Sequence, residues 1–166
     1  MSVPDLPVDL HEDLHEDLHE DLHEEPPGGP AGRFLRTAFW AEAAAATGLP
    51  LQQGAPAADL VDLVPPHGAF VVAGERRGCV GVRTLPDGAV EVKRLFVTPE
   101  ARGSGLGRSL LTWCEDWARA RGAIRLVLDT HGALTAARAL YLSAGFREVE
   151  RYNDNPHAQL WFAKEL

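Results

Sequence analysis

A glycine-rich turn lies in the second half of the chain, with an arginine at each end. Its sequence is Arg102-Gly103-Ser104-Gly105-Leu106-Gly107, followed by Arg108. Glycine permits sharp turns and lets the backbone approach a ligand closely. Free amides at the start of a helix, with the helix dipole behind them, attract phosphate, and arginine side chains match phosphate geometry. The turn is therefore a candidate phosphate site.

The spacing of the glycines separates this turn from other phosphate loops. No Gly-Lys-Ser/Thr sequence ends it, which excludes a Walker A loop. A dinucleotide fingerprint requires Gly-x-Gly-x-x-Gly, whereas these glycines stand at 103, 105 and 107. No acidic residue is clearly placed to bind a ribose after the next strand, and Asp129 is the nearest candidate. The glycines alone do not exclude the alternative that this is a tight strand–helix turn that binds no ligand.

Regular elements are expected on both sides of the turn. Apolar residues at helical spacing predict helices that end near Gly48, Gly122 and Gly145. Short apolar runs predict strands, and a Pro-Asp-Gly turn at 86–88 joins two of them as a hairpin. The expected strands are 69–73, 79–85, 89–97, 124–128, 146–151 and 159–163. Helices alternating with these strands predict an α/β fold with a mixed sheet and helices on its faces.

The N-terminal segment has a different composition. Asp-Leu-His-Glu occurs four times between Asp9 and Glu24, and a Pro/Gly linker follows. On a helix, His11, His15, His19 and His23 would form one stripe, able to bind a divalent metal or a partner. A solvated, disordered tail is the favoured interpretation. We therefore divide the chain into a tail and linker, 1–31, and a folded domain, 32–166.

Charge and cysteine content exclude several classes of protein. Ten of the 24 acidic residues lie within residues 1–25, which leaves 14 acids against 16 basic residues in the rest. This near-neutral remainder argues for neither nucleic acid nor a membrane surface as a partner. The sequence contains no apolar run long enough for a transmembrane helix and no secretory signal. Cys79 and Cys114 form no C-x-x-C pair, and a reducing, cytoplasmic location is expected.

Two motifs resemble those of the GNAT N-acetyltransferase superfamily. Arg102-x-x-Gly105-x-Gly107, preceded by the strand that ends at Val97, resembles its acetyl-CoA signature, Arg/Gln-x-x-Gly-x-Gly/Ala. Ala137-Arg-Ala-Leu-Tyr141, with Gly145-Phe146 after it, is similar to A-x-x-L-Y-x-x-x-G-F in the family's C-terminal half. The resemblance covers roughly residues 33–166. It implies the GNAT fold, a twisted mixed sheet flanked by helices. In this fold the strand before the turn, here 89–97 and called the signature strand below, is splayed from its neighbour, here 124–128.

The resemblance also implies an activity and a coenzyme site. The activity is direct transfer of acetyl from acetyl-CoA to a primary amine of a small molecule, peptide or protein, without a metal. The coenzyme diphosphate would lie on the turn amides, and the pantetheine arm would pair with the edge of the signature strand. Carried over, the coenzyme-binding residues are Leu95, Phe96, Val97, Arg102, Gly103, Ser104, Gly105, Leu106, Gly107 and Arg108.

Two residues are candidates for proton transfer. The resemblance assigns to Tyr141 the acid that protonates the leaving thiolate, and to Glu91 the base that neutralises the amine. Alternatively, Tyr141 is a core aromatic residue, Glu91 is paired with Lys93 or an arginine, and water relays the protons. Leu134 replaces an asparagine common in the family, which removes one expected coenzyme contact.

Several alternatives remain at this stage. A module of the same fold could bind acyl-CoA as a sensor without transferring it, and the tail could be the functional part. His157 lies in a polar loop, 152–157, which either borders the acceptor or is an ordinary hairpin loop. Cys114 belongs to an apolar helix face, which disfavours an acetyl-cysteine intermediate. Members of the family often form dimers, so a homodimer is compatible with the resemblance.

Overall fold

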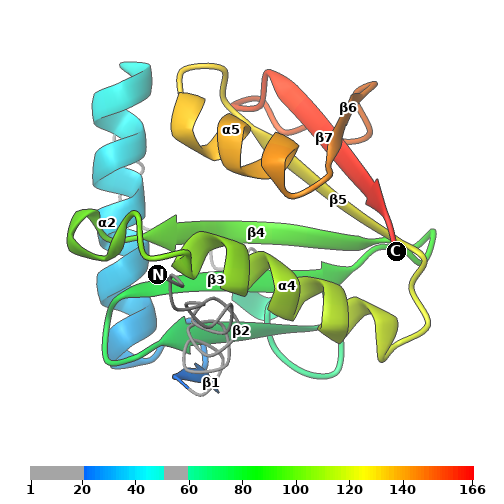
Figure 1. Ribbon diagram of the computed structural model, residues 1–166, viewed down its shortest axis with the longest axis horizontal. Coiled ribbons are helices and arrows are strands. Elements are labelled where there is room, and N and C mark those ends of the chain that lie inside the picture. The colour runs from blue at the N-terminus through cyan, green and yellow to red at the C-terminus, as the bar shows by residue number, and fades with distance from the viewer. Residues whose placement is uncertain (1–20, 51–59) are drawn as a thin grey trace, which may run out of the picture.

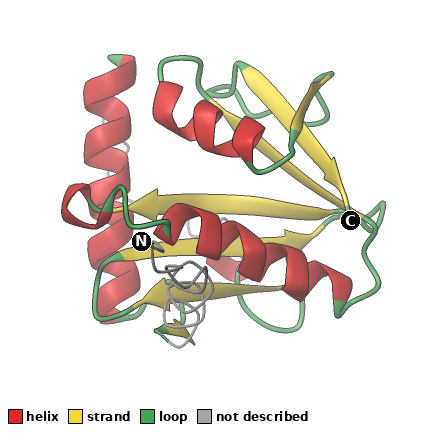
Figure 2. Cartoon of the chain, viewed as in Figure 1, coloured by secondary structure: helices red, strands yellow, loops and turns green. Residues whose placement is uncertain are grey.

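The computed structural model describes residues 21–50 and 60–166. In this part of the chain, seven strands form one mixed sheet in the order β1-β2-β3-β4-β5-β7-β6, flanked by helices (Figures 1 and 2). The strands are β1 (Leu22–Glu24), β2 (Gly68–Ala73), β3 (Gly78–Thr84), β4 (Val90–Val97), β5 (Arg125–Thr130), β6 (Arg147–Val149) and β7 (Leu160–Glu165). The helices are α2 (Pro30–Thr47), the 3-10 turn η1 (Pro99–Ala101), α4 (Leu106–Arg119) and α5 (Thr135–Ser143). The expected α/β fold is confirmed.

Strands β4 and β5 form the one parallel pair among the described strands, and they pair over a short distance. Their register contains only Val90 opposite Leu126 and Glu91 opposite Val127. Figure 1 shows the two strands meeting near the C-terminus and diverging toward α2. The splay expected beside the signature strand is therefore present. Backbone groups of β4 after Glu91 have no partner in β5.

A β-bulge lies in β4 where the two strands diverge. Lys93 pairs with Gly81 and Phe96 pairs with Cys79, so one residue of β3 faces two residues of β4. Arg94, inside the bulge, has a φ of 57°, a left-handed conformation that is uncommon outside glycine. The extra residue shifts the alternation of side chains between the two faces of the sheet.

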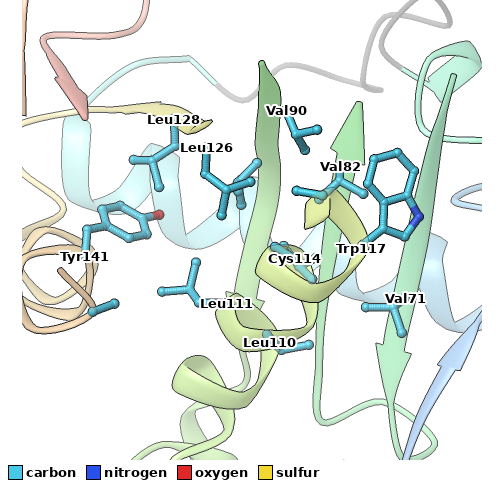
Figure 3. Close-up of a cluster of buried hydrophobic side chains, with 14 of the residues drawn as sticks. Val71, Val82, Val90, Leu110, Leu111, Cys114, Trp117, Leu126, Leu128 and Tyr141 are labelled. Atoms are coloured by element: carbon cyan, nitrogen blue, oxygen red, sulfur yellow. The ribbon is translucent and has the colours of Figure 1, made fainter. Parts of the chain in front are cut away.

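Each face of the sheet carries its own hydrophobic cluster. On one face, α4 packs Leu110, Cys114 and Trp117 against Val71 and neighbouring strands (Figure 3). On the other face, Leu35 of α2 packs with Phe70, Val72 and Phe96. Alternating residues of β2 serve the two clusters, as the two-residue period of a strand requires. The sheet is thus held between helices, with the divergent ends of β4 and β5 near α2.

The segment before α2 differs from the expected free linker. Leu22–Glu24 form an edge strand that pairs with β2, and Pro30 begins α2. The Glu25 carboxylate accepts hydrogen bonds from the backbone N–H groups of Ala31 and Gly32, both at 3.0 Å, and so caps the helix. His23 therefore lies in a strand rather than on a helical stripe. His11, His15 and His19 lie outside the described residues.

None of the described helices has the length and apolar character needed to cross a membrane.

Candidate functional site

The glycine turn connects η1 to α4 through two left-handed residues. Gly103 has a φ of 79° and Gly105 one of 85°, and Gly105 is the N-cap of α4. The Ser104 hydroxyl donates a 2.7 Å hydrogen bond to the Ala101 carbonyl and closes the turn. The backbone N–H groups of Arg108 and Ser109 donate to the Gly105 carbonyl. The first amides of α4, those before Arg108, have no intrahelical acceptor and are available to an anion.

Gly107 allows the start of α4 to lie close to α5. A Cβ atom at this position would lie 3.0 Å from Cδ2 of Leu140 and 3.8 Å from Cγ2 of Val97. The first distance is tighter than ordinary van der Waals contact. The absence of a side chain at Gly107 therefore brings the turn, α5 and the end of β4 together.

The two arginines of the turn connect it to different helices. Nη2 of Arg102 lies 2.6 Å from both carboxylate oxygens of Glu42 in α2, and its Nε donates to the Val97 carbonyl at 3.1 Å. Nη2 of Arg108 donates to the carbonyl and hydroxyl oxygens of Ser143 at the end of α5, at 2.7 and 3.1 Å. Both guanidinium groups are thus engaged with residues outside the turn.

The strand leading to the turn has one open edge. Phe96 and Val97 pair with Cys79 and Gly78 of β3 on one side, while β5 has already diverged on the other. Leu95 lies in the bulged part of the same strand. The edge residues predicted to bind an extended ligand therefore have no strand partner on the side of β5.

A cavity of about 130 Å³ lies between α2, β4, β5 and α5. Its wall on the α2 side is mainly apolar, with Phe39, Trp40, Ala43, Ala44, Thr47, Leu49 and Pro50. Its charged and polar lining residues are Lys93, Arg94, Asp129, Thr130, His131, Asn155 and His157. Leu134, Ala137 and Tyr141 line it from the α5 side. The loop around His157 thus borders the cavity.

Tyr141 lies on this cavity, as expected for a proton donor. Its side chain packs against the rings of Phe146 and Phe162, at centroid distances of 6.1 and 5.9 Å. Figure 3 shows the ring beside Leu128, with the hydroxyl pointing toward the strands. Burial and the nearby charge of Asp129 raise the pKa of Tyr141. The phenol therefore stays protonated at neutral pH.

Glu91 occupies a different position from Tyr141. Its carboxylate is buried and lines a second cavity, of about 270 Å³, which Tyr141 does not border. Oε2 accepts a 2.6 Å bond from Nε of Arg83, and Oε1 accepts bonds from the Tyr152 hydroxyl at 2.9 Å and from Asn153 at 3.1 Å. Burial and the Glu91 charge raise the pKa of Tyr152. The two predicted catalytic residues thus line different cavities.

The carboxylate that does share a cavity with Tyr141 is Asp129, at the end of β5. Its Oδ2 accepts a 2.5 Å bond from Nδ2 of Asn153, and its Oδ1 accepts a 3.0 Å bond from Nδ2 of Asn155. Lys93 Nζ lies 3.5 Å from Asp129 and 3.5 Å from Glu91, between the two carboxylates. The sequence indicated Asp129 only as a ribose ligand. The polar run from Tyr152 to His157 is the signal that points to its partners.

Neither cysteine is placed for catalysis. Cys79 and Cys114 are both buried and unpaired, and neither lines the two cavities described above. Burial raises the pKa of Cys79 to about 12 and that of Cys114 well above its usual value. Within residues 21–50 and 60–166, no group of three metal-ligating side chains occurs.

Relatives of the chain match a little over half of its length. An uncharacterised N-acetyltransferase of Schizosaccharomyces pombe is 41% identical over 97 residues, which are 55% of this chain and 60% of that protein. An IAA acetyltransferase of Azospirillum brasilense is 44% identical over 95 residues, 54% of this chain and 61% of that protein. The matched part of the chain spans about three fifths of the length of these relatives.

The fold and a family model agree with these relatives. A crystal structure of a GNAT-family acetyltransferase from Staphylococcus aureus superposes with a TM-score of 0.70 and 16% identity, covering 87% of this chain and 97% of that one. The model of the acetyltransferase (GNAT) family matches residues 10–146. The splayed strands and the glycine turn agree with this match. The chain belongs to the GNAT acetyltransferase family.

Proposed function

We propose that the protein is an N-acetyltransferase that carries acetyl from acetyl-CoA to a primary amine of a small molecule, a peptide or a protein. The observation that carries this proposal is the divergence of β4 from β5 after Glu91. It leaves a strand edge that runs from the glycine turn to the cavity holding Tyr141. A ligand with an anionic end, an extended amide-bearing arm and a reactive end matches this sequence of sites.

The coenzyme diphosphate would bind at the start of α4. The amides of Gly103, Ser104, Gly105, Leu106 and Gly107 supply hydrogen-bond donors there. Arg102 and Arg108 supply positive charge, although each is engaged with a residue of another helix in the free protein. The pantetheine arm would pair with the open edge at Leu95, Phe96 and Val97, as an added strand does.

The reaction itself joins the amine nitrogen to the acetyl carbon and breaks the carbon–sulfur bond. The electron pair of that bond stays on sulfur, which then needs a proton. Tyr141 supports this step, because the residue lines the cavity and its raised pKa keeps the hydroxyl protonated. A proton donor near the leaving group lowers the barrier to its departure.

Glu91 as the base stays a prediction from the sequence. Donor groups from Arg83, Tyr152 and Asn153 surround its buried carboxylate. This arrangement favours an indirect role for Glu91, in which it does not contact the substrate but orients Lys93 and the 152–157 loop. Direct contact with an acceptor amine would require the carboxylate to exchange one of these partners.

The test is an acceptor screen that detects free thiol released from acetyl-CoA. Purified full-length protein is incubated with acetyl-CoA and single primary amines, with acetyl-CoA alone as the control for hydrolysis. We expect amine-dependent thiol release and an acetylated product of matching mass. Tight coenzyme binding by calorimetry without thiol release for any amine would instead favour a sensor of the same fold.

A further inference from the structure

The cavity beside Tyr141 contains a single carboxylate among its described lining residues, that of Asp129. The side chain of Asp129 is 8% exposed, and Lys93 and Arg94 contribute two positive charges to the same lining. A buried carboxylate is costly unless cations or hydrogen-bond donors compensate its charge. The cavity lining therefore carries one negative charge, on Asp129, and two positive charges, on Lys93 and Arg94.

The Asp129 carboxylate is fixed in place but not saturated. Asn153 donates to one oxygen and Asn155 to the other, with Lys93 Nζ at 3.5 Å. An ionised carboxylate has about four acceptor sites, so these donors leave room for another. The charge of Asp129 also contributes to the raised pKa of Tyr141, so the two groups act in one electrostatic environment.

We infer that Asp129 binds the acceptor ammonium and takes its proton, and that the acceptor is a monoamine with an apolar body. This inference rests on the proposed acetyl transfer. Asn153 and Asn155 are positioning residues, since each holds one oxygen of the carboxylate. The assignment places the base and the acid, Tyr141, on the same cavity, which the pairing of Tyr141 with Glu91 does not.

The walls of the cavity define the class of acceptor. Phe39, Trp40, Ala43 and Ala44 present an apolar surface from α2, opposite the strand ends that carry Asp129. An apolar carbon skeleton would bury its surface there. A polyamine would bring further ammonium groups next to Lys93 and Arg94, with no second carboxylate in the described lining to pair with them.

The protons balance in this scheme. The acceptor ammonium gives one proton to Asp129, and the freed lone pair forms the bond to the acetyl carbon. As the carbon–sulfur bond breaks, Tyr141 donates a proton to sulfur. The second proton of the nitrogen restores the Tyr141 hydroxyl through water, and Asp129 returns its proton to solvent. The net products are the amide, the free thiol and one proton.

The test compares two isosteric variants, Asp129→Asn and Glu91→Gln, with 2-phenylethylamine and spermidine as acceptors. For Asp129→Asn we expect kcat/KM with 2-phenylethylamine to fall at least 100-fold and the acidic limb of its pH profile to disappear. Coenzyme affinity, measured by calorimetry, should stay within about twofold of the wild type. Glu91→Gln should keep the acidic limb. The reverse pattern would overturn the assignment in favour of Glu91.

Two further measurements separate this inference from the proposed function. Calorimetric binding of 2-phenylethylamine to the protein–CoA complex should weaken at least tenfold in Asp129→Asn, and this readout needs no turnover. Equal binding by variant and wild type, or a preference for spermidine, would overturn the inference while leaving acetyl transfer intact. Asn155→Ala, which removes only one positioning amide, should lower kcat/KM about tenfold if Asp129→Asn proves too unstable to assay.

Discussion

Arg102 and Glu42 form an ion pair across 60 positions of sequence, with Nη2 of the arginine 2.6 Å from both carboxylate oxygens. The pair joins the glycine turn to α2, and both side chains are nearly half exposed. The guanidinium predicted to meet the coenzyme diphosphate is therefore held by a carboxylate in the free protein. At the proposed coenzyme site, the diphosphate and Glu42 would compete for the same donor.

Glu42→Gln should consequently tighten coenzyme binding. An exposed ion pair contributes roughly 0.2–1 kcal/mol, which corresponds to an affinity gain of about 1.4- to 5-fold. Calorimetry with CoA at low salt measures the change. Asp87→Asn is the matched control, because Asp87 pairs with Arg125 at 2.9 Å in a similarly exposed setting. Weaker binding by Glu42→Gln would show that the pair orients Arg102 for the coenzyme instead.

Gly105→Leu should abolish coenzyme binding while the domain still folds. Gly105 has a φ of 85°, so a side chain costs about 1–2 kcal/mol there and displaces the amides of the turn. Gly88 has a φ of 82° in the hairpin between β3 and β4, and a Cβ atom added there would meet open space. Gly88→Leu thus carries the same backbone strain as a control, and it should bind CoA normally.

Tyr141→Phe should lower kcat about 100-fold and leave the affinity for CoA nearly unchanged. The substitution removes the proton donor but keeps the ring that packs on Phe146 and Phe162. Since the pKa of Tyr141 is raised, ionisation of this phenol should not reduce the wild-type rate below about pH 10. Steady-state kinetics from about pH 6 to about pH 10 checks both expectations. An intact rate in the variant would assign the proton to water.

Both cysteines should resist alkylation in the native protein. Cys79 and Cys114 are buried, and their raised pKa values keep them as thiols near neutral pH. Mass spectrometry after treatment with iodoacetamide at about pH 8 should find no adduct in the native protein and two adducts after denaturation in urea. Rapid labelling of either residue would contradict its burial, and an acetyl group retained on one of them would contradict direct transfer.

The Cys79 thiol should also make stability depend on pH. Burial raises its pKa from 9.0 to about 12, so the unfolded chain loses this proton first as the pH rises. The stabilisation is complete below about pH 9 and is lost progressively above it, at up to about 1.4 kcal/mol per pH unit. Urea unfolding between about pH 8 and about pH 11 should show a shallower decline for Cys79→Ala than for the wild type.

The long elements were predictable because their apolar residues repeat at a helical or strand period. Leu110, Cys114 and Trp117 recur along one face of α4, and all three are buried as that period requires. Strand β1 was not predictable. Its three residues belong to a repeat whose favoured interpretation is a disordered tail, and pairing with β2 decides their conformation.

The site residues likewise divide into those that a local motif predicts and those that only the tertiary fold brings together. The turn and Tyr141 carry local motifs, so their sequence alone indicates their place. The hydrogen bonds from Asn153 and Asn155 to Asp129 connect residues 24 and 26 positions apart, and no local pattern marks such pairs. The donors around Glu91 come from β3 and from the 152–157 loop, so its partners likewise depend on the tertiary fold.

The short pairing between β4 and β5 has a consequence for handling the protein. Beyond Glu91, β4 has no strand partner on the side of β5, and edges without a strand partner can template aggregation with other chains. A bound pantetheine arm would cover that edge as a surrogate strand. Preparations saturated with CoA should therefore melt at a higher temperature and aggregate less during concentration than preparations stripped of it.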